Sequence, residues 1–119
     1  KKVFLFALAA LFLASPALAQ QVYTKDSLKT WDREKTAGGE GTLYGKYSFT
    51  RHDNTDGLAI KEIGWMTLQP GASIGMHLHE TSSEVIYILA GQGKVLYEGE
   101  YLPLTAGTTH YCPKGMGHS

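Results

Sequence analysis

Two histidines, His77 and His79, lie one residue apart in the stretch MHLHE, and Glu84 follows five positions after the second. Side chains at positions i and i+2 of a β-strand point to the same face, so we expect both imidazoles to face the same way. A further histidine, His118, follows a Pro-x-Gly turn near the end of the chain. Imidazole nitrogens and one carboxylate form a mixed shell that suits a first-row divalent ion, whereas magnesium and calcium prefer oxygen ligands. These four residues are therefore the candidate metal ligands.

Ordinary structural roles compete with this hypothesis. His52 lies in the polar turn HDNTDG and is expected to stay outside the site. For His110 two interpretations stay open: it lines the same cavity, or it binds no metal, as is usual for a lone histidine. Glu84 taken alone would more often be a solvated charge, because glutamate is seldom buried without a partner.

Short strands must position these residues. From Gly38 onward, runs that favour strands alternate with turn signals such as QPG, GQG and PKGMG. The expected strands are Thr42–Arg51, Ala59–Leu68, Ser73–His79, Val85–Ala90, Lys94–Tyr97, Glu100–Leu104 and Thr109–Cys112. Many short strands at this spacing predict an all-β sandwich or barrel. Residues 20–40 form an N-terminal extension, in which Ser27–Lys35 is predicted to form a turn or two of helix.

The first 19 residues have the pattern of a secretory signal peptide. Two lysines precede the apolar run Val3–Ala14, and Ala17-Leu18-Ala19 is a small-residue cleavage signal. The alternative is a membrane anchor, but spanning a bilayer takes about 20 apolar residues. We therefore expect cleavage before Gln20, export to the periplasm or the medium, and no membrane attachment afterwards.

The composition of the remaining chain limits its partners. The leader takes two of the 11 Lys and Arg residues and none of the 11 acidic ones, so residues 20–119 have a net charge of −2. Nucleic-acid binding would need a basic stripe and is not expected. Cys112 is the only cysteine and cannot form an internal disulfide. A domain this small must then be stabilised by its core, a metal or a partner subunit.

The order and spacing of the candidate ligands and nearby glycines form two motifs. They read Gly71-x5-His77-x-His79-x4-Glu84-x6-Gly91 and Gly107-x5-Pro113-x-Gly115-x2-His118. This pattern resembles the two motifs of the cupin superfamily. Only residues 92–106 separate them, so the chain is most similar to compact, single-domain microbial cupins (monocupins).

The resemblance implies a small antiparallel β-barrel of the jelly-roll type over residues 41–119. Cupins usually continue with closing strands after the second motif, and these strands are expected to be missing here because the sequence ends at Ser119. By motif position, the implied metal ligands are His77, His79, Glu84 and His118. The implied cofactor is one divalent transition metal, with iron or manganese first and nickel, zinc or copper as alternatives. The motif glycines would occupy turns that need a positive φ.

The resemblance also implies a function for the exported protein. We expect a mononuclear metal enzyme, an oxidoreductase of the dioxygenase kind, that acts on a small polar or anionic molecule at open metal positions. A non-catalytic module that binds a sugar or small molecule, and a carbohydrate isomerase or lyase, stay open, because the sequence singles out no further acid or base. Arg51 is either an anion-binding residue or a surface side chain.

Packing and assembly complete the expectations. Four large side chains are expected to pack the barrel rather than shape its cavity: Trp65, Met66, Tyr87 and Tyr97. The run EVIYILA is apolar on both faces beyond its glutamate. One face points into the barrel and the other needs cover, so a homodimer is expected.

Overall fold

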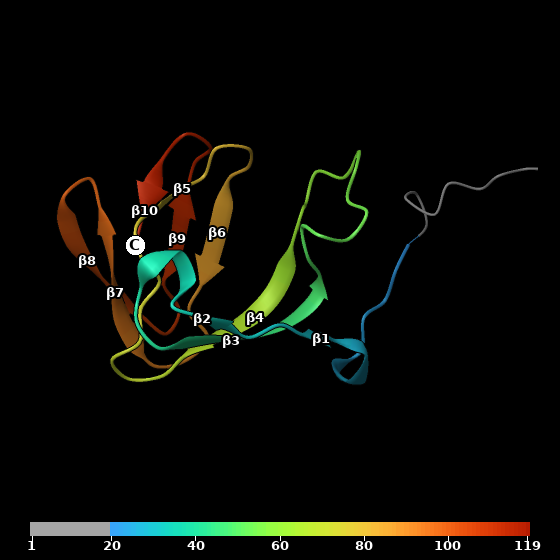
Figure 1. The fold of residues 1–119 in the computed structure, drawn as a ribbon, viewed down its shortest axis with the longest axis horizontal. Coiled ribbons are helices and arrows are strands. Elements are labelled where there is room, and N and C mark those ends of the chain that lie inside the picture. The colour runs from blue at the N-terminus through green and yellow to red at the C-terminus, as the bar shows by residue number, and fades with distance from the viewer. Residues whose placement is uncertain (1–19) are drawn as a thin grey trace, which may run out of the picture.

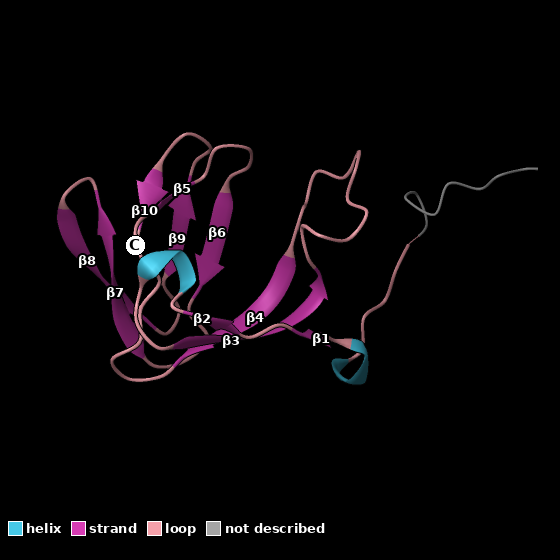
Figure 2. Ribbon diagram, in the orientation of Figure 1, coloured by secondary structure: helices cyan, strands magenta, loops and turns pink. Residues whose placement is uncertain are grey.

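The computed structural model describes residues 20–119, and the predicted signal peptide lies outside the described residues. Strands dominate this part of the chain (Figures 1 and 2), with two short 3₁₀ turns, η2 (Lys25–Ser27) and η3 (Thr36–Gly38). The strands are β1 (Lys29–Thr30), β2 (Arg33–Glu34), β3 (Thr42–Phe49), β4 (Ile63–Leu68), β5 (His77–Leu78), β6 (Glu84–Tyr87), β7 (Gln92–Tyr97), β8 (Glu100–Thr105), β9 (Thr109–Cys112) and β10 (Gly117–His118). The predicted all-β class is confirmed. Within residues 20–119, no helix is long and apolar enough to cross a membrane.

The strands pair antiparallel in four groups. β3 pairs with β4 along one edge and with β1 and β2 along the other, while β5 pairs with β10, β6 with β9, and β7 with β8. Figure 1 shows the last three pairs standing beside one another, with the β3–β4 ribbon extending below them. Backbone hydrogen bonds in both directions between Leu96 and Ser119, at 2.9 and 3.2 Å, connect β7 to the end of β10. These bonds join the β7–β8 hairpin to the β5–β10 pair.

The segment before β3 differs from its predicted structure. The helix expected over residues 27–35 is wrong, because this segment forms β1 and β2 after a single 3₁₀ turn. Lys29 is opposite Tyr47 and Arg33 is opposite Leu43, so both strands are held by long-range pairing with β3. Local sequence preference does not encode that pairing.

Several strands are shorter than predicted. The strand expected over residues 59–68 begins only at Ile63, and the one expected over 73–79 is reduced to β5. The strand expected over 85–90 begins one residue earlier and ends at Tyr87. β10 was not expected, whereas β9 has the predicted bounds. As the resemblance implies, the motif glycines 71, 91, 107 and 115 all have a positive φ, between 80° and 88°.

Tyr47 is the centre of the packed region around β3 and is fully buried. Its ring lies against the backbone of Gly45 and Gly64, where a Cβ atom would come within 2.2 and 2.4 Å of ring atoms. Arg33 Nη2 donates to the Tyr47 hydroxyl at 2.5 Å, and its guanidinium lies 4.3 Å from the Trp31 ring centre. The only other buried hydrophobic side chains within residues 20–119 are Leu43, Val95 and Cys112, which are 3%, 4% and 0% exposed. The apolar core is therefore small.

Candidate metal centre

Two strand pairs deliver the four candidate ligands to one place. His77 and His118 are direct cross-strand partners in the β5–β10 pair. His79 follows β5 and stays in register, because its amide donates to Met116 and its carbonyl accepts from Gly115. Glu84 opens β6, opposite Cys112 of β9. The i, i+2 relation of the two motif histidines thus places both imidazoles beside His118.

Four donor atoms, one from each of these residues, lie within 4.8 Å of one another. His118 Nε2 is 3.2 Å from His77 Nε2, 3.1 Å from His79 Nε2 and 3.1 Å from Glu84 Oε2. His79 Nε2 is 3.5 Å from the same Glu84 oxygen. Two ligands of one ion, each about 2.1 Å away and separated by 90–110°, lie roughly 3.0–3.4 Å apart. Three of these four separations lie in that range, and the 3.5 Å between His79 and Glu84 corresponds to a slightly wider angle at the ion, so the cluster fits a shared first-row ion.

The tautomer of His77 is fixed by its backbone partner. His77 Nδ1 lies 3.0 Å from the carbonyl oxygen of Gly75, which can only accept a hydrogen bond. Nδ1 therefore carries the proton, and the Nε2 lone pair faces the cluster. This arrangement, with the outer ring nitrogen donating to an oxygen, is the usual support for a metal-binding histidine.

Burial keeps the other imidazoles neutral. The pKa of His118 is lowered to about 4, first by burial and then by the nearby charges of His77, His110 and His79 when they are protonated. The pKa of His79 is also lowered, mainly by burial, although Glu84 acts in the opposite direction. Neutral imidazoles have the free lone pair that a metal ligand needs.

The sequence and structure comparisons agree with this geometry. Residues 64–119 match the family model described as a Cupin domain, and this range holds all four candidate ligands. A solved structure of a predicted oxalate decarboxylase from Thermotoga maritima superposes with a TM-score of 0.71 at 26% identity, covering 82% of this chain and 84% of that chain. The fold of this protein is therefore an all-β cupin barrel.

A curated relative adds a second point of similarity. The Oxalate-binding protein of Thermotoga maritima is 41% identical over 54 residues, which are 45% of this chain and 45% of the relative. The match thus spans less than half of the relative's length. The cupin-domain match covers residues 64–119, and the His/Glu cluster within it has the donor set of a divalent metal site.

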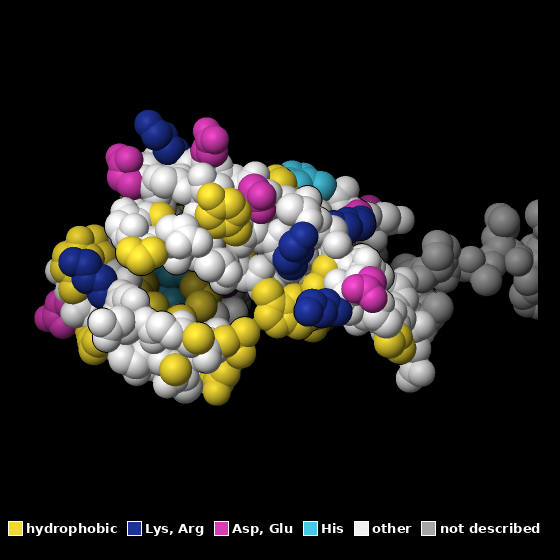
Figure 3. Space-filling view, turned by 90° about the horizontal axis from the view of Figure 1, so that it is seen from below, with side chains coloured by type: hydrophobic (Ala, Val, Ile, Leu, Met, Phe, Trp, Pro, Cys, Tyr) yellow, Lys and Arg dark blue, Asp and Glu magenta, His cyan; other side chains and the backbone are white. Residues whose placement is uncertain are grey.

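The cupin barrel is open to solvent near its histidines. Figure 3 shows an opening in one face, with imidazole side chains visible inside it and hydrophobic side chains around it. The side chain of Glu84 is 28% exposed and that of His118 only 4%.

His110 lies directly behind His118. It is on β9, and its Nε2 is 2.8 Å from His118 Nδ1, the ring nitrogen opposite the one in the cluster. His110, Cys112 and His118 form a second group of metal-binding residue types with donor atoms within 4.8 Å. Cys112 is fully buried, and burial raises the pKa of its thiol. His110 is therefore close to the site but not among the four converging donors.

Two other residues considered from the sequence lie elsewhere on the cupin barrel. His52 is exposed, and its ring packs edge-on against Trp31 at 5.1 Å between ring centres, outside the donor cluster as expected. Arg51 is on the surface after β3 and forms an ion pair with Glu62, with 3.3 Å between Nε and Oε2. Of the two roles considered for Arg51, the geometry favours the surface side chain.

The packing role expected for the large strand residues is wrong for three of them. Trp65, Met66 and Tyr87 are 49%, 41% and 58% exposed. Tyr97 fits the expectation better, since it is partly buried and its ring lies 6.1 Å from the His110 ring, edge to face.

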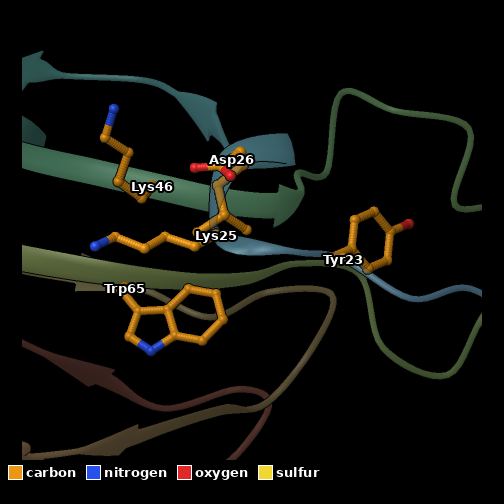
Figure 4. Close-up of a pocket in the computed structure, with 6 residues that line it drawn as sticks. Tyr23, Lys25, Asp26, Lys46 and Trp65 are labelled. Carbon is orange, nitrogen blue, oxygen red and sulfur yellow. The ribbon is translucent and has the colours of Figure 1, made fainter.

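Two hollows lie away from the donor cluster. One, of about 590 Å³, lies against β3 and β4 (Figure 4) and is lined by Tyr23, Lys25, Asp26, Leu28, Lys46 and Trp65. The other, of about 350 Å³, lies at the β7–β8 hairpin and is lined by Tyr97, Glu98, Glu100 and Leu102. Neither is lined by a candidate metal ligand, so the cluster inside the barrel is the better candidate site.

Proposed function

We propose that the protein binds one divalent transition-metal ion through His77, His79, Glu84 and His118 and holds a small carboxylate, oxalate or a close analogue, on that ion. The observation that carries this proposal is the convergence of three imidazole nitrogens and one carboxylate oxygen within 4.8 Å of one another, with the other three donors 3.1–3.2 Å from His118 Nε2. Four protein ligands leave one or two positions of a five- or six-coordinate ion for an external ligand.

The charge of the site favours an anion. Neutral imidazoles leave the charge of a divalent ion unchanged, and Glu84 cancels only one unit of it. The loaded site keeps a net positive charge in a partly buried place, where charge interactions are stronger than in water. The names of both similar proteins refer to oxalate, a small anion with two carboxylates. These observations support a carboxylate over a neutral sugar.

Calorimetric titration with oxalate tests the proposal. The protein is stripped with a chelator and then loaded with manganese, iron or zinc, and the metal content of each sample is measured. Oxalate should bind the loaded protein and not the stripped one, and acetate should bind more weakly because it has a single carboxylate. Failure to retain any metal, or oxalate binding of equal strength without metal, would overturn the proposal.

Turnover of the bound carboxylate is the second candidate function, favoured by the decarboxylase named in the similar structure. A bound divalent ion would supply Lewis-acid polarisation of the carboxylate. Conversion of hydrogen oxalate to carbon dioxide and formate keeps atoms and charge balanced, whereas dioxygenase chemistry would consume oxygen. Formate and oxygen-uptake assays on the loaded protein separate the two reactions. Tight binding without either product would select a binding module.

A further inference from the structure

The ring nitrogen of His118 that faces away from the donor cluster has its own partner, His110. The two nitrogens, His118 Nδ1 and His110 Nε2, are 2.8 Å apart. The ring centres are 5.0 Å apart and the ring planes differ by only 26°. If the rings were stacked face to face, their centres would be closer together than 5.0 Å when two of their nitrogens are 2.8 Å apart. Both nitrogens must therefore lie near the line that joins the ring centres. The two rings therefore meet edge to edge, in the geometry of a hydrogen bond.

We propose that His110 is a positioning residue for the metal centre. His110 accepts a hydrogen bond from His118 Nδ1 and so keeps the His118 Nε2 lone pair directed at the ion. This inference rests on the proposed metal site. A neutral imidazole carries one proton, so a His118 that binds metal through Nε2 must be protonated on Nδ1. His110 Nε2 is then the acceptor, and the His110 proton lies on its own Nδ1.

The fold gives His110 this position without making it a ligand. His110 and Cys112 lie on the same face of β9, because they are two residues apart, and His110 is opposite Ile86 of β6. His77 and His118 thus receive equivalent support: Gly75 O holds Nδ1 of His77 at 3.0 Å, and His110 holds Nδ1 of His118. Loss of such an outer partner typically weakens metal binding by about 10- to 100-fold.

A second metal ion held by His110, Cys112 and His118 is the competing explanation. Two nitrogens bound to one tetrahedral ion, each about 2.0–2.1 Å from it, would lie about 3.3 Å apart. The observed 2.8 Å is shorter and typical of a hydrogen bond. The Cys112 thiol is directed at backbone carbonyl oxygens, 3.7 Å from that of Met116 and 3.9 Å from that of Pro113. The hydrogen bond is the better explanation.

The test uses zinc, which is diamagnetic, and the wild-type protein first. Nitrogen-15 NMR of the zinc-loaded protein should show His118 protonated on Nδ1, with slow proton exchange and a coupling to His110 Nε2. His110→Leu should speed this exchange and weaken zinc affinity by about 10- to 100-fold in competition titrations. His110→Gln, whose amide oxygen can accept the hydrogen bond, should recover most of the affinity. Cys112→Ala, a change two residues away on the same face, should keep one zinc per chain.

The possible failures are distinguishable. A wild-type protein that binds no zinc would overturn the proposed metal site itself. Zinc binding with His118 Nδ1 exchange and affinity unchanged in His110→Leu would overturn only the role of His110. Two zinc ions per chain, one of them lost in Cys112→Ala, would show a second metal site in place of the hydrogen bond.

Discussion

Replacing His79 with alanine should remove most of the stabilisation that a bound metal gives the fold. His79 Nε2 is one of the four donors, 3.1 Å from His118 Nε2 and 3.5 Å from Glu84 Oε2. An ion that binds only the folded protein stabilises it by mass action, by an amount that depends on the ratio of free metal to the dissociation constant. Removing one of four donors raises that constant.

The expected size of the effect follows from this ratio. At a metal concentration 100 times the wild-type dissociation constant, the ion contributes about 2.7 kcal/mol to the free energy of unfolding. Loss of an outer partner alone can cost about 100-fold in affinity, so loss of a direct ligand should cost at least as much. The contribution then falls to about 0.4 kcal/mol at the same metal concentration. For a domain of this size, the difference corresponds to roughly 10–20 °C in melting temperature.

Thermal unfolding followed by circular dichroism, with and without metal, measures the effect. The shift caused by metal is compared within each variant, so that any cost of the substitution to the metal-free fold cancels. The matched control is His52→Ala, because His52 lies in an exposed turn against Trp31. The control should show the wild-type shift. Equal shifts in the two variants would refute the assignment, and the histidines of MHLHE would then be ordinary strand residues.

Three further predictions concern pH, assembly and export. In the metal-free protein the pKa of His118 is lowered to about 4, against about 6.5 in an unfolded chain, so the unfolded state takes up the proton first as the pH falls. The His118 contribution to stability should therefore be constant above about pH 6.5 and fall by about 3 kcal/mol between about pH 6.5 and 4. Urea unfolding across this range should show a smaller loss of stability in His118→Gln than in the wild type, and an equal loss would contradict the prediction. Val85 and Tyr87 are 66% and 58% exposed on the outer face of β6, so we expect this apolar face to be covered in a dimer. Light scattering should show a dimer for the wild type and a monomer for Val85→Glu, whereas a wild-type monomer at micromolar concentration would count against the prediction. N-terminal sequencing of the exported protein should begin at Gln20, and retention of the preceding residues would show that the signal peptide was misread.

The convergence of the four candidate ligands could be predicted because their positions depend on rules that act over short distances. The i, i+2 relation places His77 and His79 on one face, and glycine at positions such as Gly71 and Gly115 marks turns with a positive φ. These features survive even though β5 is only two residues long. The spacing of the motifs then supplied Glu84 and His118, which the fold brings together.

Other features depend on partners that are distant in the sequence. β1 and β2 form because β3 offers them an edge to pair with. Their own polar sequence does not favour a strand over a helix, so the pairing with β3 decides their structure. The position of His110 behind His118 depends on the placement of the β6–β9 pair beside β10. The exposure of Trp65 depends on whether anything covers the outer face of β4. Periodicity within a strand cannot decide these questions, because it describes a face and not what lies against it.

The candidate metal centre and the closure of the barrel rest on the same contacts. β10 contains only two residues, and a backbone hydrogen bond contributes about 1 kcal/mol net, which is comparable to the entropy cost of ordering one residue. The short β5–β10 pair therefore gains little from its backbone alone. The other contributions are the two hydrogen bonds between Ser119 and Leu96 and the burial of His118, which is 3% exposed. An ion held by β5, β6 and β10 would join strands that the small apolar core holds only weakly. Metal binding would then be coupled to folding, as in other small metal-binding domains, and the melting temperature would report both the ligand set and the closure of the barrel.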